Sequence, residues 1–214
     1  MYQTYVSATL GSMVSQAAMR GINGAAPIDW KDTLLSGMMT GTAFIAYPVA
    51  CNFLKNHCPD FKQKFEDPKA CKLTVYLRGG MLGAAICTAL NYPLTVAKQC
   101  HAAKDGKGPK ITLKGAAGFY ADQVGSSIGF ATTMGTLAPK VPIPKNSFLA
   151  WARQHALVNI SNVGGKCFAF PIHYLRHGST LTGMVGGYLK GMGGVVICGD
   201  ATNHFKNVFQ FMLQ

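Results

Sequence analysis

Two acidic side chains in this sequence lie close to or inside apolar stretches, and they are the first candidates for chemistry. Asp122 precedes an uncharged stretch, and Asp200 lies inside another, with His204 four residues further on. An ionisable group inside a membrane segment indicates a functional site by default. Two structural roles compete with that interpretation. Asp122 is expected to cap a helix that starts just after it, and Asp200 and His204 are expected to form a polar pair one helical turn apart.

The remaining reactive residues do not suggest catalysis. The other acids are expected in loops, which leaves the apolar segments without paired carboxylates for acid–base chemistry. We expect no two histidines at the close helical spacing of a metal or redox centre. The seven cysteines contain no C-x-x-C pair, and Cys58 and Cys71 either pair or stay free. The sequence therefore predicts no enzyme, no metal site and no cofactor other than bound phospholipid.

The elements that position these residues are long uncharged runs. Residues 33–54, 79–97 and 123–139 contain no Asp, Glu, Lys or Arg, and each is about long enough to cross a ~30 Å hydrocarbon layer as a helix. Residues 1–19, 154–175 and 181–212 are less uniform. Only 13% of all residues are charged, against about 25% in soluble domains. These features favour an all-α integral membrane protein over a soluble helical protein with a buried core.

We therefore predict one membrane domain over residues 1–214, with about six Gly-rich helices in three hairpin pairs. The predicted helices span residues 2–24, 33–55, 73–101, 117–139, 147–176 and 181–212. An interior glycine costs a soluble helix about 1 kcal/mol, whereas in a membrane small residues let helix backbones approach closely. The predicted packing positions are Gly37, Gly41, Gly79, Gly83, Gly187 and Gly191.

The net charge of +12 indicates an anionic partner. Most cations lie in loops beside the apolar runs, where each favours anionic lipid head groups by about 1 kcal/mol. No basic helix face interleaved with aromatic residues is present, so nucleic acid is not an expected partner. The polar residues within the later segments are predicted membrane or lipid contacts. They are Lys166, Lys190, Asp200 and His204.

Three segments repeat one pattern: a Gly-rich run, an aromatic residue followed by proline, a short apolar stretch, and a cation. They occupy residues 36–55, 79–98 and 163–176. A proline late in a helix frees a backbone acceptor and kinks the helix. The connection between the first two segments is too short for another crossing helix, which predicts that they run antiparallel.

This repeat resembles the mitochondrial carrier family, whose odd-numbered helices run parallel and end in Pro-x-Asp/Glu-x-x-Lys/Arg after a Gly-rich run. Two copies keep the proline and the cation but replace the acid with Thr95 or His173, and the third keeps only the proline. The remnants of the motif are Pro48, Pro93, Thr95, Lys98, Pro171, His173 and Arg176. The chain is also shorter than a carrier.

The resemblance implies a multi-pass protein of the mitochondrial inner membrane. In the family the acids and cations of the motif form a salt-bridge ring that closes a gate, and that ring cannot form here. We therefore expect a carrier-like protein that has lost transport and serves as an accessory subunit of a respiratory complex or ATP synthase, bound to other membrane subunits and to anionic lipid such as cardiolipin.

Two alternatives remain. One is a divergent transporter of an anionic metabolite, with Lys98, Lys166, Arg176 and Lys190 as substrate contacts. The other is a small inner-membrane import or channel component.

Overall fold

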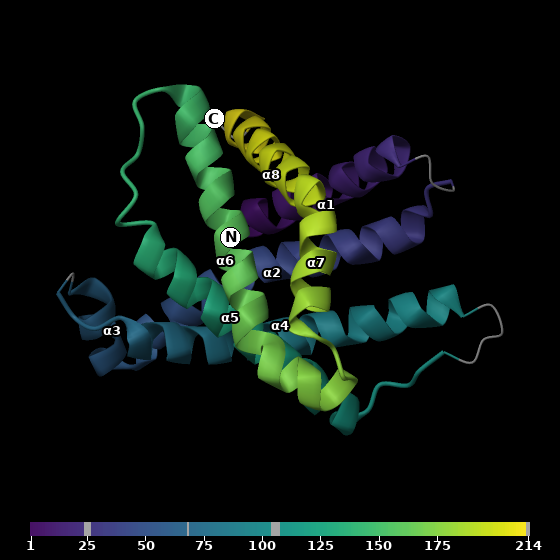
Figure 1. Ribbon diagram of the computed structural model, residues 1–214, viewed down its shortest axis with the longest axis horizontal. Helices are drawn as coiled ribbons and strands as arrows, with labels where there is room; N and C mark the ends of the chain where they lie inside the picture. The colour runs from purple at the N-terminus through teal and green to yellow at the C-terminus, as the bar shows by residue number, and fades with distance from the viewer. Residues whose placement is uncertain (24–26, 68, 104–107, 213–214) are drawn as a thin grey trace. The chain divides into compact units, whose positions relative to one another are not determined.

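The computed structural model describes residues 1–23, 27–67, 69–103 and 108–212, and every regular element within them is an α-helix (Figure 1). The helices are α1 (Tyr2–Ile22), α2 (Trp30–His57), α3 (Pro59–Glu66), α4 (Leu73–Ala102), α5 (Leu113–Leu137), α6 (Ser147–His177), α7 (Leu181–Lys190) and α8 (Met192–Met212). The predicted all-α class is confirmed. The expected end of the first helix at residue 24 lies outside the described residues.

The number of helices differs from the sequence prediction in two places. The charged segment after α2 is not only a loop, because it contains α3, which starts with a proline in its first turn and buries Phe61. Lys72 closes the other end of this helix, because its ammonium donates to the backbone carbonyls of Lys64, Phe65 and Asp67 at 2.6–2.7 Å. The last predicted helix is two helices, α7 and α8, with a break between them.

Six membrane spans are not confirmed. In the described part of the chain, α2 and α4 are long and apolar enough to cross a membrane, and the bent pair α7 and α8 would make a third span if it crosses as one. Helix α1 has sufficient length but is rich in small polar residues, and its buried positions include Ser7, Thr9, Ser12 and Ser15. Such residues make transfer into hydrocarbon less favourable.

The described helices form two compact units. Unit 1 comprises residues 1–46, 87–119 and 191–214, and unit 2 comprises residues 47–86 and 120–190. Helices α2, α4 and α5 each contribute residues to both units. The single domain that the sequence suggests remains a prediction.

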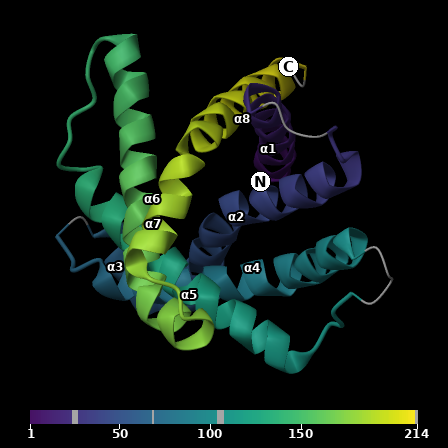
Figure 2. The same cartoon turned by 45° about the vertical axis from the view of Figure 1, so that its right-hand side comes forward.

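Unit 1 is built around α1, which packs against α8 in both views of the ribbon (Figure 2). A Cβ atom at Gly11 would lie 2.8 Å from the carbonyl oxygen of Cys198, so the two backbones are nearly in contact. The Ser15 hydroxyl donates to the Gly194 carbonyl at 2.6 Å. A buried hydroxyl is thereby satisfied by the backbone of the neighbouring helix.

The other side of α1 packs against α2. A Cβ atom at Gly37 would lie 2.8 Å from the Thr9 carbonyl oxygen, and one at Gly41 would lie 2.9 Å from that of Tyr5. As the residue number rises along α2 it falls along α1, so the two helices run antiparallel. Their approach is limited by backbone atoms, which is the situation in which glycine cannot be replaced without a shift of the helix.

Unit 2 contains a second close helix pair, α5 and α6. A Cβ atom at Gly125 would lie 2.7 Å from the Ala169 Cα, and one at Gly129 would lie 2.8 Å from the Gly164 carbonyl oxygen. These helices are also antiparallel. In the same unit, a Cβ atom at Gly79 would lie 2.9 Å from the ring of Tyr47, and Gly83 is buried.

The remaining predicted packing glycines lie on α7 or directly after it. Gly187 on α7 has nothing within 4 Å of the position its Cβ would take, and Gly191 is exposed at the break between α7 and α8. Gly187 therefore makes no close packing contact in unit 2, and Gly191 lies outside the regular helices.

Gly41→Leu tests the contact between α1 and α2. The Cβ alone would lie 2.5 Å from Thr9 Oγ1 and 2.9 Å from the Tyr5 carbonyl oxygen. Because overpacking forces the helices apart, we expect the free energy of unfolding to fall by about 1–3 kcal/mol. Denaturant unfolding of the detergent-solubilised protein, followed by circular dichroism, measures this change.

The matched control is Gly21→Ala in the last turn of α1, where nothing lies within 4 Å of the new Cβ. Alanine favours the helix, so stability should stay the same or rise by up to about 1 kcal/mol. An equal loss of stability in both variants would contradict the close approach of α1 and α2 at Gly41.

Candidate functional site

Two clusters of charged residues are the candidate functional sites, one in each unit. The first ion cluster consists of Arg20, Asp29, Asp32, Lys98 and His101 in unit 1. The second ion cluster consists of Asp122, His173, Arg176 and His177 in unit 2. In each cluster, a carboxylate from one helix lies beside the cation that follows the proline of a second helix.

The first ion cluster lies between the start of α2 and the end of α4. Lys98 Nζ is 3.3 Å from an oxygen of Asp32 and donates to the Ser36 hydroxyl at 2.6 Å. Arg20 Nη2 is 3.5 Å from the other Asp32 oxygen. The Asp32 side chain is 20% exposed, so its carboxylate neutralises two cations in a largely desolvated place. The expectation that Asp32 lies in a loop is wrong, because it occupies the first turn of α2.

The register of α2 and α4 produces this pairing. Further along the same two helices, the Asn91 side-chain amide donates to the Met39 carbonyl at 3.0 Å. Asn91 precedes Lys98 on α4, whereas Met39 follows Asp32 on α2, so the two helices run antiparallel as the short connection predicts. The antiparallel direction differs from the parallel arrangement of the odd-numbered carrier helices.

Asp29 forms the outer end of the first ion cluster. One of its oxygens accepts from the backbone N–H groups of Lys31 and Asp32 at 3.0 and 3.1 Å, which caps α2. Its other oxygen is 2.7 Å from His101 Nε2. The N–H of Asp32 first, and the His101 side chain second, hold the pKa of Asp29 below its usual value.

The second ion cluster lies between α5 and the last turns of α6. One oxygen of Asp122 forms an ion pair with Arg176 Nη1 and is 3.3 Å from His177 Nε2. The other oxygen is 3.9 Å from His173 Nε2, and although it is buried it has no hydrogen-bond partner. The carboxylate is 18% exposed.

The glycine contacts of α5 and α6 set this geometry. Gly125 faces Ala169, and these helices are antiparallel. One turn back along α5 is Asp122, and one turn forward along α6 is His173, so both lie on the contacting faces and meet.

Two sequence expectations about these residues are wrong. Asp122 does not cap a helix, because α5 begins at Leu113 and Asp122 lies in its interior. Two histidines do have close helical spacing, because His173 and His177 are four residues apart on α6. Together with Asp122 they place three ligand atoms within 4.8 Å of one another. The signal in the sequence is His-x-x-x-His, and it is easily overlooked because His177 flanks the end of an apolar segment.

The other motif remnants occupy ordinary helical positions. Pro48, Pro93 and Pro171 lie inside α2, α4 and α6, and each of these helices continues beyond its proline. At the position of a carrier's acid, the Thr95 hydroxyl donates to the backbone carbonyl of Asn91 at 2.8 Å.

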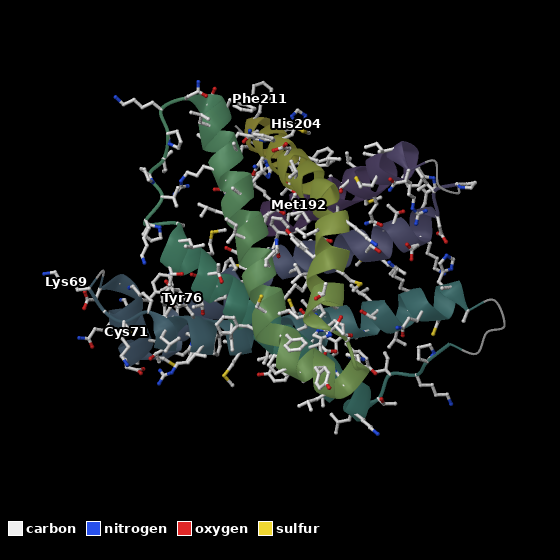
Figure 3. All side chains as sticks on the ribbon, in the orientation of Figure 1. Lys69, Cys71, Tyr76, Met192, His204 and Phe211 are labelled. Atoms are coloured by element: carbon white, nitrogen blue, oxygen red, sulfur yellow. The ribbon has the colours of Figure 1, made fainter. Side chains whose placement is uncertain are left out.

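The predicted polar contacts of the later helices stay outside both clusters. Lys166 is half-buried in the middle of α6, and Lys190 is the exposed last residue of α7. Asp200 and His204 are exposed on α8, and His204 is labelled in Figure 3. Their pairing with each other remains a prediction.

Unit 2 also contains an apolar cavity of about 410 Å³. Its lining residues are Cys71, Lys72, Leu73, Tyr76, Thr132, Gly135, Thr136, Pro139 and Lys140, of which Cys71 and Tyr76 are labelled in Figure 3. Lys140 is exposed. All seven cysteines, including Cys58 and Cys71, are free thiols.

No family model, curated protein or solved structure matches the chain. The resemblance to mitochondrial carriers therefore remains a prediction, and the function is argued from the geometry of these sites.

Asp29→Asn tests the charge of the residue that caps α2. Asparagine keeps an acceptor for the helix amides but loses the charge beside His101. The pKa of Asp29 in the folded chain lies below its ordinary value of 3.8. The stability that the charge contributes is therefore complete above that value and is lost as the pH falls through the lower folded-state pKa.

We expect wild type to melt at a higher temperature than Asp29→Asn at about pH 5, with the gap closing towards about pH 2. Thermal melts across this range measure the gap. A gap that stays constant down to the lowest pH would show that the charge of Asp29 plays no part.

Proposed function

We propose that this chain is a non-catalytic structural subunit of a membrane protein complex. By its resemblance to carriers we assign it to the mitochondrial inner membrane, as an accessory subunit of a respiratory complex or ATP synthase. Two or three apolar helices of sufficient length support membrane insertion.

The observation that carries this proposal is the pairing of the two motif cations. An anion transporter needs cations that a substrate can reach and discharge during each cycle. Lys98 is instead held between Asp32 and Ser36, and Arg176 is held by Asp122. A cation paired with a carboxylate has little net field left for an anionic substrate, and both carboxylates are largely buried, which adds to the cost of breaking each pair. These residues are suited to holding neighbouring helices together rather than to binding and releasing an anionic substrate.

The exposed apolar surface supports a role in assembly. On helix α7, no atom lies within 4 Å of the place that a Cβ would take at Gly186 or Gly187. Leu181 and Leu189 on the same helix are exposed. Glycines that are unused inside the chain leave room for the backbone of a partner helix. We assign α7 to contact with another membrane subunit.

The apolar cavity of unit 2 supports the binding of an anionic phospholipid such as cardiolipin. Leu73, Tyr76 and Pro139 provide apolar walls for an acyl chain, and Lys140 provides an exposed ammonium at the lining. An ammonium beside an apolar cavity matches a lipid phosphate joined to an acyl chain.

The assembly role predicts a larger complex after extraction in mild detergent. The wild-type chain should co-migrate with other membrane polypeptides and with anionic phospholipid, both identified by mass spectrometry. Gly187→Leu should keep its helical content but leave the complex, because the side chain fills the space of a partner helix. Gly21→Leu, at another open glycine, is the matched control and should stay in the complex.

Migration of the wild type alone, at its own 22.8 kDa plus detergent, would contradict the proposal. Uptake of an organic anion by reconstituted vesicles, abolished by Lys98→Met, would favour the transporter instead. Wild-type protein that retains its partners but carries no anionic phospholipid would overturn only the lipid assignment.

A further inference from the structure

We propose that Asp122, His173 and His177 form a binding site for one divalent transition-metal ion of the Zn²⁺ type. This inference does not depend on the proposed role in a membrane complex. It uses Asp122, which also pairs with Arg176, together with two histidines that the structural role leaves unexplained.

The positions of the three donors suit one ion. Their ligand atoms all lie within 4.8 Å of one another, and each histidine Nε2 faces a different oxygen of Asp122, at 3.9 Å from His173 and 3.3 Å from His177. Ligand bonds of about 2.0–2.2 Å in a tetrahedral site bring donor atoms to roughly 3–3.5 Å from one another. The widest separation must therefore close by about 1.3–1.8 Å, which rotations of the imidazole rings and of the carboxylate provide.

The helical framework holds the ligands in place. His173 and His177 are one turn apart on the same face of α6, with ring centroids 5.4 Å apart. Asp122 comes from α5, and the glycine contacts between α5 and α6 keep this carboxylate opposite the two rings. Ligands from two tightly packed helices give a site that changes little when the ion arrives.

The donor set selects the class of ion. Two imidazoles with one carboxylate suit Zn²⁺ and its neighbours in the first transition series, whereas Ca²⁺ and Mg²⁺ take oxygen ligands. Three protein ligands leave a fourth position for water or for a ligand from elsewhere. The His177 side chain is 44% exposed, so the ion has access from outside.

Two further observations favour a cation here. The Asp122 oxygen that faces His173 is buried and has no hydrogen-bond partner, and an ionised oxygen left in that state is costly. The histidines lie in the last turns of α6, which ends at the left-handed Gly178, and the end of a helix carries a partial negative charge. A metal ion would satisfy the oxygen and interact favourably with the helix end.

Arg176 is the competitor of the metal ion. Its guanidinium pairs with the Asp122 oxygen that also faces His177. The ion must therefore share the carboxylate with the guanidinium or displace it, and the positive charge of Arg176 also repels it. The site is accordingly weaker than it would be without this arginine, and Arg176→Gln should bind the ion more tightly than wild type.

Zn²⁺ titration of the full-length, chelator-treated protein in detergent tests the site. We expect one Zn²⁺ per chain, and Co²⁺ should give the visible absorption of a low-coordinate site. Loss of a residue that only orients a metal ligand weakens metal binding by roughly 10–100-fold. His173→Ala and His177→Ala each remove a ligand itself, so each should weaken Zn²⁺ binding by more than that. His204→Ala, which removes an exposed histidine on α8, is the matched control and should bind like wild type.

Arg176→Gln keeps all three ligands and separates metal binding from misfolding, with circular dichroism as the check on helical content. Tighter binding in this variant supports the site. Three results would overturn it: no stoichiometric binding by wild type, an equal loss in His204→Ala, or a loss in Arg176→Gln as large as that in His173→Ala.

Discussion

The pairing of helix-borne cations with carboxylates from neighbouring helices is the interaction on which the rest of this structure depends. Lys98 and Arg176 belong to helices with few other charges, where an unpaired ammonium or guanidinium is costly. Asp32 and Asp122 neutralise them from α2 and α5. The pair of Asp32 and Lys98 fixes the rotation and register of α2 and α4, because a shift by one residue would turn the acid away from its cation. Between α5 and α6 the glycine contacts already hold the register, and the pair of Asp122 and Arg176 adds to it. The register then determines which other side chains meet.

Close helix approach makes these pairs possible. Glycines 37 and 41 let α1 lie against α2, and glycines 125 and 129 let α5 lie against α6. Once the backbones are in contact, side chains one or two turns away come within reach of each other. Arg20 meets Asp32 in this way, and Asp122 meets the histidines of α6. The glycines and the ions therefore act together, with packing setting the distance and charge setting the register.

Much of the helical framework follows from the sequence alone, because uncharged runs and their charged borders mark helix ends. The predicted segment from residue 73 to 101 differs from α4 at its end by one residue. Helix α3 escapes prediction because its many charges hide the single buried Phe61. The partners of Lys98 and Arg176 escape it for another reason. Contacts between residues far apart in sequence depend on helix rotation, which composition does not encode. In addition, neither Asp32 nor Asp122 occupies a position of the carrier motif.

Within unit 1, the contacts between α2 and α4 are antiparallel. In this part of the chain the helices with motif remnants run in opposite directions, whereas carrier repeats are parallel, and only the copy in α4 keeps the carrier spacing of proline and cation. Short Gly-rich helices that end in a cation arise wherever apolar helices pack closely and anchor at a polar boundary. Shared physical demands therefore explain part of the repeat, whatever its origin.

A double-mutant cycle on Asp32 and Lys98 tests whether the paired charges hold the helices together. Denaturant unfolding in detergent would be compared for wild type, Asp32→Asn, Lys98→Met and the double variant. Because the two groups are in contact, we predict a favourable coupling energy of about 0.5–3 kcal/mol. Effects that add to within about 0.3 kcal/mol would mean that the carboxylate does not hold the cation, and would contradict the dependence of the fold on this pairing.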